Sequence, residues 1–187
     1  MSGRLQRWRV PLGFVAAAAL IVASRPHPWS LALGLPIAAL GLGIRAAAAG
    51  HIHKNEVLAT SGPYRYTRNP LYLGSTVLGF GLVIAASSWL LALLAAAMLL
   101  GVYMPVIRQE ERFLQARFGE EYTAYAARVP RLWPRLRPVG GSGEGGGFSF
   151  ALYRRHREYH ALLGFLVMAV VLVGKWLAAA PRGLGLW

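Results

Sequence analysis

The sequence predicts an all-α integral membrane protein with about five transmembrane helices. Hydrophobic residues make up 56% of the 187 residues, and the mean hydropathy is +0.43. Charged residues make up only 14%, which is too few to cover the surface of a soluble domain of this length. In addition, apolar stretches of helical length recur along the chain, as expected of bilayer spans of about 20 residues.

Five apolar segments are the predicted spans, at residues 10–24, 29–49, 71–87, 89–107 and 160–180. The first is short and follows three arginines, so a signal peptide is the alternative, but we favour a retained helix because the next span follows closely. Only the pair Ser87-Ser88, at the end of the third span, separates it from the fourth. We therefore expect a tight turn and a helical hairpin over residues 71–107.

The basic residues predict the orientation. Three stretches contain seventeen of the 20 Lys and Arg residues: before span one, from Arg45 near the end of span two to span three, and between spans four and five. The opposite side has only Arg25 and Arg182, and Lys175 lies within span five, close enough to its end to snorkel. The positive-inside rule then predicts a multi-pass plasma (inner) membrane protein with a cytoplasmic N-terminus and an outside C-terminus. The positive charge indicates contact with membrane lipids and argues against nucleic acid as a partner.

Two long cytoplasmic segments remain, at residues 50–70 and 108–159. In the second, a helix continuing from span four is expected to end at Gly119, and a new helix to begin at Glu120 and Glu121, whose charges suit a helix N-terminus. Residues 148–159 look like a basic interfacial helix. A stripe at helical spacing is expected to pack against the membrane face; it consists of Leu114, Phe118, Tyr122 and Tyr125.

The stretch from Gly62 to Gly74 reads GPYRYTRNPLYLG. Asn69 is a suitable N-cap and Pro70 suits the first helical position, so span three is expected to begin there. Arg68 then lies at a helix N-terminus, which favours an anionic ligand group. Gly74 would let a ligand or a neighbouring helix approach. The alternative is an arginine-rich cap that only obeys the positive-inside rule.

Glu110 and Glu111 lie where span four leaves the bilayer, in a chain with only 7 acidic residues. Adjacent helical residues diverge by about 100°, so at most one of the two can point into a shared cavity. A carboxylate at this boundary is a natural partner for a cationic ligand; the alternative is ion pairing with Arg108, Arg112 or Arg68. The chain has no Cys and 5 His, and we predict no metal site.

The ordered motifs resemble the isoprenylcysteine carboxyl methyltransferase and phospholipid methyltransferase superfamily. They are Gly-Pro-Tyr, Arg-Asn-Pro-Leu-Tyr-Leu-Gly, Glu-Glu, Phe-Gly-Glu-Glu-Tyr and Val-Pro-Arg, within residues 51–134. The resemblance implies a membrane-embedded methyltransferase that uses S-adenosylmethionine, with cytoplasmic helical segments forming the cofactor pocket and active site. A lipidic or small hydrophobic acceptor is implied: a prenylcysteine carboxylate, a phospholipid amine or a thiol. The implied catalytic residues are Glu110 and Arg68, and the implied cofactor-binding residues are His51, Tyr64, Arg68, Asn69, Tyr72, Glu110 and Glu111.

The implied organisation is a single membrane domain over residues 1–187. Two spans occupy residues 10–50, the methyltransferase-like core residues 51–138, a Gly-rich linker residues 139–150, and an interfacial helix with the fifth span residues 151–187. Asn69 replaces the His usual in prenylcysteine methyltransferases, and apolar Val106 lies close to the position of their upstream Arg. Two alternatives stay open: a reductase of the sterol or steroid type that uses NADPH, and a non-enzymatic membrane scaffold.

Overall fold

The computed structural model describes residues 15, 18–52, 57–139 and 147–179, and this part of the chain is helical without strands. The predicted spans at 29–49, 71–87, 89–107 and 160–180 all fall on helices. The elements are α2 (Pro28–Ala49), η1 (Gly62–Arg65), α3 (Pro70–Ala86), α4 (Trp89–Met98), the π-helical turn η2 (Leu99–Tyr103), α5 (Met104–Arg128), α6 (Phe150–Arg155) and α7 (Tyr159–Ala179).

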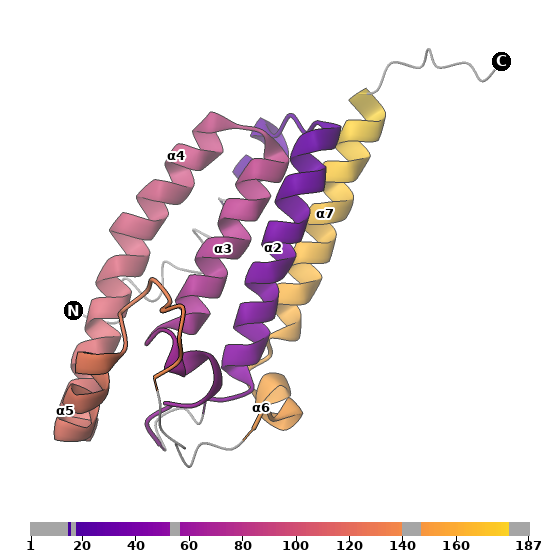
Figure 1. Cartoon of the computed structure of the whole chain (residues 1–187). Coiled ribbons are helices and arrows are strands. Elements are labelled where there is room, and N and C mark those ends of the chain that lie inside the picture. Colours follow the sequence, from indigo (N-terminus) through magenta and orange to yellow (C-terminus); the bar gives the residue numbers. More distant parts are fainter. Residues whose placement is uncertain (1–14, 16–17, 53–56, 140–146, 180–187) are drawn as a thin grey trace.

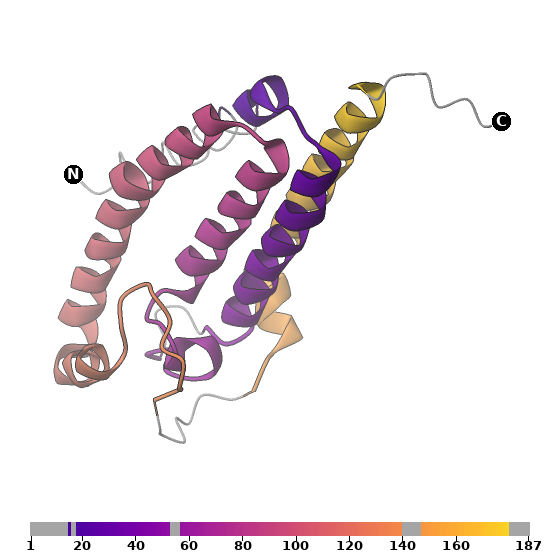
Figure 2. The same cartoon turned by 45° about the horizontal axis from the view of Figure 1, so that its top comes forward.

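The long helices lie side by side in the order α4, α3, α2 and α7 (Figure 1). Among the described residues, three stretches are long and apolar enough to cross a membrane: α2, α7 and the continuous helix Trp89–Arg128 that comprises α4, η2 and α5. α3 is apolar but has only 17 residues. Figure 2 shows α4 inclined away from α3 toward the end that carries α5. The described part of the chain is therefore an all-helical membrane protein.

α2 and α3 pack through glycines, and much more extensively than α3 packs against α4. A Cβ added at Gly41 would lie 2.2 Å from the backbone nitrogen of Leu78, and one added at Gly81 would lie 2.3 Å from that of Ala38. Gly74 faces Arg45 and the carbonyl of Gly41. Of the two uses expected for Gly74, the structure thus shows the approach of a neighbouring helix, as is common for small residues between membrane helices.

The predicted hairpin turn is confirmed. Ser87 ends α3 in the left-handed conformation, with φ of 50°, and α4 begins two residues later. Of the predicted span at 10–24, residues 18–23 are helical, and most of the remainder lies outside the described residues. So does most of the Gly-rich linker, at residues 140–146.

Lys175 was expected to snorkel, but its ammonium group is bound within the protein. It donates hydrogen bonds to the carbonyl oxygens of Ile21, at 2.6 Å, and Ser24, at 2.8 Å. Carbonyls at a helix C-terminus have no partner in their own helix, which explains why they attract this ammonium group. Lys175 thereby links α7 to the C-terminal end of the helical residues 18–23.

The helix that leaves span four is broken at Gly119, as predicted. Gly119 has φ of 52° and ψ of −119°, and helix continues from there to Arg128. The π-helical turn η2 comes just before Pro105; proline has no N–H group, which removes one helical hydrogen bond. The interfacial helix expected at 148–159 is shorter, since α6 covers only Phe150–Arg155.

Candidate functional site

Two segments that are distant in sequence are joined just before α3 begins. We call residues 129–139, which follow α5, the strap. The strap runs beside residues 65–69, and three backbone hydrogen bonds connect them: Arg68 N to Pro130 O at 2.9 Å, Arg135 N to Tyr66 O at 3.0 Å, and Val139 N to Arg65 O at 3.1 Å. The strap therefore fixes the loop that precedes α3.

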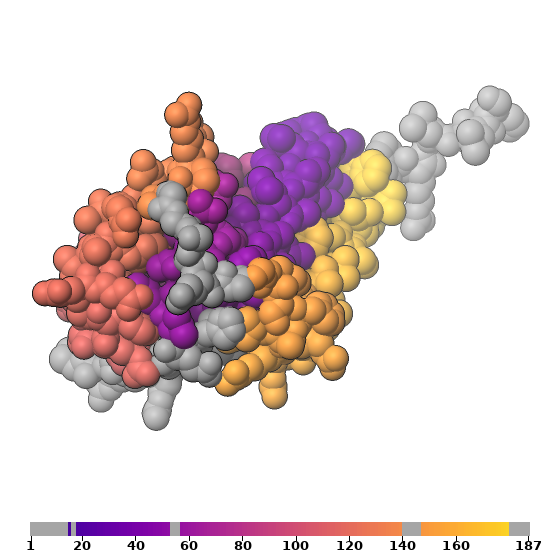
Figure 3. Space-filling model, turned by 60° about the horizontal axis from the view of Figure 1, so that its bottom comes forward, coloured from indigo at the N-terminus to yellow at the C-terminus, as the bar shows by residue number. Residues whose placement is uncertain are grey.

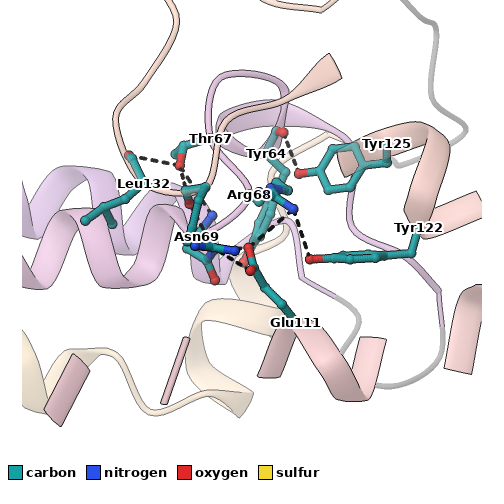
Figure 4. A network of polar contacts seen from close by, with 9 residues as sticks. Tyr64, Thr67, Arg68, Asn69, Glu111, Tyr122, Tyr125 and Leu132 are labelled. Carbon is teal, nitrogen blue, oxygen red and sulfur yellow. Dashed lines mark hydrogen bonds and ion pairs between the residues drawn. The ribbon is translucent and has the colours of Figure 1, made fainter. Parts of the chain in front are cut away.

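Two buried polar side chains reinforce this junction (Figure 4). The Thr67 hydroxyl donates to the carbonyl of Leu132 at 3.0 Å, and the Asn69 amide donates to the carbonyl of Arg131 at 2.9 Å. Asn69 occupies the predicted N-cap position of α3, but its side chain makes no capping hydrogen bond. The expected cap is wrong because the amide is held by the strap and, at 3.4 Å, by Glu111.

Glu111 is buried and surrounded by donors. Its carboxylate accepts from Arg131 Nε at 2.7 Å and forms an ion pair with Arg68 Nη1 at 3.4 Å. Ion pairing, the alternative considered for the Glu pair, therefore describes Glu111. The contribution of Arg131 was not predicted, although it follows Val-Pro in one of the ordered motifs. A lone arginine in a loop gives no local indication of such a distant partner.

Glu110 points elsewhere, as the 100° step between adjacent helical residues requires. Its Oε2 accepts a hydrogen bond from the Tyr72 hydroxyl at 2.9 Å, and it lines an open pocket, whereas Glu111 does not. The Tyr72 ring is itself packed edge-on against Tyr103, with centroids 5.8 Å apart. The geometry thus identifies which of the two carboxylates faces the cavity.

The pocket lies between the loop before α3 and the helix α5. Arg68 and Glu110 are its only charged lining residues in the described part of the chain, and the rest of the wall is mainly aromatic and aliphatic. Its lining residues are Ile52, Val57, Leu58, Ala59, Tyr64, Arg68, Asn69, Pro70, Leu71, Tyr72, Glu110, Leu114, Phe118, Tyr122 and Tyr125.

The pocket corrects one expectation from the sequence. The aromatic stripe of α5 was expected to pack against the membrane face, yet Leu114, Phe118, Tyr122 and Tyr125 all line the cavity. They also pack around Leu58 from the opposite wall. The helical spacing identified one face of the helix correctly, but it could not show what that face contacts.

Arg68 carries the clearest sign of a binding site. Its Nη1 reaches Glu111 and, at 3.5 Å, the hydroxyl of Tyr122. Its Nε is buried and has no hydrogen-bond partner among the described residues. A buried unpaired donor is costly, by about 1–3 kcal/mol or more for a charged group. This donor belongs to a residue of the pocket wall, so it fits a ligand that brings an acceptor oxygen.

Tyr64 forms part of the buried wall. Its side chain is 5% exposed, and burial raises the pKa of its phenol far above the ordinary value. The Tyr64 carbonyl accepts a hydrogen bond from the Tyr125 hydroxyl at 2.8 Å. Tyr64 is therefore a neutral phenol that offers an aromatic surface rather than a base.

His51 lies behind the wall and does not line the pocket. Its Nδ1 lies 2.7 Å from the carbonyl oxygen of Ala47. A Cβ added at Gly62, which has φ of 54°, would lie 2.6 Å from the His51 ring. Five of the seven predicted site residues thus line one pocket, namely Tyr64, Arg68, Asn69, Tyr72 and Glu110. His51 and Glu111 support it from outside.

Comparison with known proteins gives consistent results. The phospholipid methyltransferase family matches residues 30–121. The cobalt-zinc-cadmium resistance protein CzcN of Cupriavidus metallidurans is 38% identical over 71% of this chain, and the nickel-cobalt-cadmium resistance protein NccN of Alcaligenes xylosoxydans xylosoxydans is 32% identical over 71%. These matches span 64% and 65% of the two relatives' own lengths. No solved structure matches the chain.

A third relative has an enzymatic name. The protein-S-isoprenylcysteine O-methyltransferase of Schizosaccharomyces pombe is 31% identical over 45% of this chain and 36% of its own length.

The fold and pocket define an all-helical membrane protein with a polar and aromatic site at one end of the helices. The chain is thus similar to the phospholipid methyltransferase family over residues 30–121, and its relatives include protein-S-isoprenylcysteine O-methyltransferases. Within the described residues, no three His, Asp or Glu side chains are grouped as metal ligands would be.

Proposed function

We propose that this protein is a membrane-embedded methyltransferase that moves a methyl group from S-adenosylmethionine to a lipidic or small hydrophobic acceptor. The observation that carries the proposal is the pocket of Arg68, Glu110 and several tyrosines, most of whose lining residues fall within the stretch that matches the family. The pocket offers one cationic and one anionic group within an aromatic wall. This combination suits a zwitterionic ligand with an aromatic base.

The residues present fit the cofactor. S-adenosylmethionine has a carboxylate, an ammonium group, a sulfonium and an adenine. The buried Nε of Arg68 would donate to the carboxylate, and Glu110 would attract a cationic group. The rings of Tyr64 and Tyr72 would face the sulfonium or the adenine. Asn69 contributes to the wall.

Two of the seven predicted residues act through others in this proposal. Glu111 orients the Arg68 guanidinium through the ion pair at 3.4 Å. His51 supports the turn at Gly62 by filling the space next to it. We therefore assign them as positioning residues, and keep Arg68 and Glu110 as the charged residues that touch the ligands.

When bound, the cofactor supplies an activated methyl group. The protein orients the reactants for an in-line displacement and excludes water from them. A carboxylate acceptor needs no base, but an amine or thiol acceptor must first lose a proton. Glu110 can accept that proton, because its carboxylate lies at the pocket wall and is bonded to the Tyr72 hydroxyl.

We also propose five spans in one membrane domain, with the pocket on the cytoplasmic side of the plasma (inner) membrane. The support is the distribution of Lys and Arg in the sequence together with three helices of spanning length and apolar α3. Reporter fusions after Gly147 and after Trp187 test this arrangement. We expect the first reporter inside and the second outside; the same side for both would remove the fifth span, and exchanged sides would reverse the orientation.

The function is tested by incubating membranes with S-adenosylmethionine that carries a labelled methyl group. Membranes containing the protein are expected to accumulate label in a lipid or small hydrophobic product, and membranes containing the Glu110→Gln variant much less. If the two preparations label equally, Glu110 is not part of the active site. If instead the protein consumes NADPH and transfers no label, it is a reductase.

A further inference from the structure

The C-terminal segment beyond the strap lies outside the residues matched by the family, and it has a distinct chemistry. Arg154, Arg155 and Arg157 are all exposed. The only acidic residue in 147–179 is Glu158, and its carboxylate is bound by Arg45 of α2 with N–O distances of 2.9 to 3.1 Å. The exposed side of this segment is therefore strongly basic.

This basic segment also exposes aromatic rings and directly precedes a span. Phe148 is 52% exposed and Phe150 is 63% exposed. α6 ends at Arg155, and α7, which is apolar and of spanning length, begins at Tyr159. A segment so close to the start of a span must lie near the membrane surface. Arginines together with exposed phenylalanines are typical of segments that lie in that interface.

The same segment holds one wall of the pocket. The backbone N–H of Ser149 donates to the carbonyl of Gly50 at 2.9 Å. The Phe148 ring lies edge-on to His51, with centroids 6.2 Å apart. The imidazole of His156 hydrogen-bonds the carbonyl of Ile52 at 3.2 Å. Residues 50–52 are thus attached to residues 148–156.

Ile52 makes this attachment relevant to the site, because it is one of the residues that line the pocket. Seen from the end of the molecule that carries the pocket loop, α6 lies on the surface beside the start of α7 (Figure 3). In Figure 1, η1, α5 and α6 all lie at this end. A force on α6 would therefore be transmitted to Ile52 through two hydrogen bonds and one ring contact.

We propose that residues 148–157 bind anionic lipid headgroups at the surface of the membrane that α7 crosses, and that this contact strengthens cofactor binding by fixing the wall at Ile52. The first part depends only on the C-terminal segment; the second part rests on the proposed function. An anionic surface attracts Lys and Arg residues near it, and the attraction falls off within the screening length of the salt. Zwitterionic lipid lacks this attraction.

The lipid contact can be measured without any activity, because the chain contains no native cysteine. An environment-sensitive dye is attached to Ala151→Cys, an exposed site on α6. The labelled protein is placed in nanodiscs of phosphatidylcholine, alone or with about a third of phosphatidylglycerol. We expect a blue shift in the anionic discs that high salt reverses. Identical spectra in both discs would overturn the lipid contact.

Matched variants assign the shift to the basic segment. Arg154→Gln together with Arg157→Gln is expected to abolish the shift. The control pair is Arg128→Gln with Arg137→Gln, which removes the same charge from exposed arginines outside α6, and it is expected to keep the shift. A shift lost equally in both pairs would mean that total charge, rather than this segment, is responsible.

Coupling to the pocket is measured by titrating S-adenosylhomocysteine into the same discs. We expect about tenfold tighter binding in anionic discs than in phosphatidylcholine discs. In the His156→Ala variant we expect this difference in affinity to disappear while the dye still shifts. The melting temperature of the variant is measured to show that it is folded. Equal affinity in both discs, with an intact dye response, would overturn the coupling. No binding in any disc would overturn the proposed function, and the dye measurement would still decide the lipid contact.

Discussion

The interface between α2 and α3 and the polar site beside α5 are built in opposite ways. The interface relies on missing side chains: Gly34 and Gly41 of α2 approach the backbone of α3 so closely that a Cβ would overlap it. The site relies on long side chains that cross between segments, such as Arg131 reaching Glu111. The interface between α2 and α3 is close-packed, whereas the polar site contains a pocket.

The difference separates structural from functional constraints. The glycine interface leaves no room for a ligand, so it can only hold the helices in position. The polar site satisfies Glu111 with three donors from two segments, yet leaves Arg68 Nε buried without a partner among the described residues. Local rules of packing and pairing tend to be violated at functional sites. The unpaired donor therefore points to the pocket as the functional region.

The largest expected effect is on the glycine interface. Gly41→Leu would place a side chain where even a Cβ lies 2.2 Å from the backbone of Leu78. We expect the helices to separate and the free energy of unfolding to fall by about 3 kcal/mol. The control is Gly43→Leu, because a Cβ at Gly43 meets nothing within 4 Å. Thermal unfolding of both variants in detergent measures the difference; equal melting temperatures would show that the interface is not close-packed.

The two adjacent carboxylates should respond differently to the same change. Glu111→Gln leaves Arg68 and Arg131 without their anionic partner, and we expect the free energy of unfolding to fall by about 2 kcal/mol. The loss is smaller than for a fully buried ion pair because the Arg131 side chain is 44% exposed. Glu110→Gln keeps the fold, since Glu110 accepts one hydrogen bond, from Tyr72. We expect it to lower turnover instead. Melting temperature and methyl transfer are measured on both variants. If Glu111→Gln lowers turnover and Glu110→Gln lowers the melting temperature, the two carboxylates have the opposite roles.

Arg68→Ala tests the unpaired donor. A hydrogen bond to a charged group contributes about 1.5–3 kcal/mol, so we expect affinity for S-adenosylhomocysteine to fall roughly tenfold to a hundredfold. Arg131→Ala is the control, since it also removes a partner of Glu111 but does not line the pocket. If both variants lose stability and both keep their affinity, Arg68 serves only as an ion-pair partner.

The smallest expected effect is at Tyr72. Tyr72→Phe keeps the ring and removes the hydroxyl that donates to Glu110. A hydrogen bond of this kind contributes about 1 kcal/mol, so turnover is expected to fall about fivefold while the melting temperature changes little. Tyr103→Phe, which removes a hydroxyl from the ring next to Tyr72, is the control. An equal fall in both variants would show that the effect is not specific to the hydrogen bond to Glu110.

Much of the fold could be predicted because it depends on local sequence. Apolar length predicts the helices, the Ser87-Ser88 pair predicts the hairpin turn, and Gly119 predicts the break in α5. These features depend on backbone propensity and on transfer to the bilayer, both of which act within a few residues. The structure differs from such predictions by only a residue or two in most helices.

The site could be predicted only in part. Motif order predicted Arg68, Tyr72 and Glu110 as site residues, and all three line the pocket, but it could not distinguish Glu110 from Glu111. The strap was not foreseen either: it draws Asn69 away from the capping role that its local sequence favours and brings Arg131 to Glu111. These contacts join residues at least 20 positions apart, where local propensity carries no information about the partner.

The central claim is that the pocket beside α5 binds an adenosyl cofactor. Titration calorimetry on the purified wild-type protein tests it directly, with S-adenosylmethionine, S-adenosylhomocysteine and NADPH as the three ligands. We expect binding of both adenosyl ligands with a dissociation constant on the order of micromolar, and no heat with NADPH. Heat with NADPH and none with either adenosyl ligand would contradict the account.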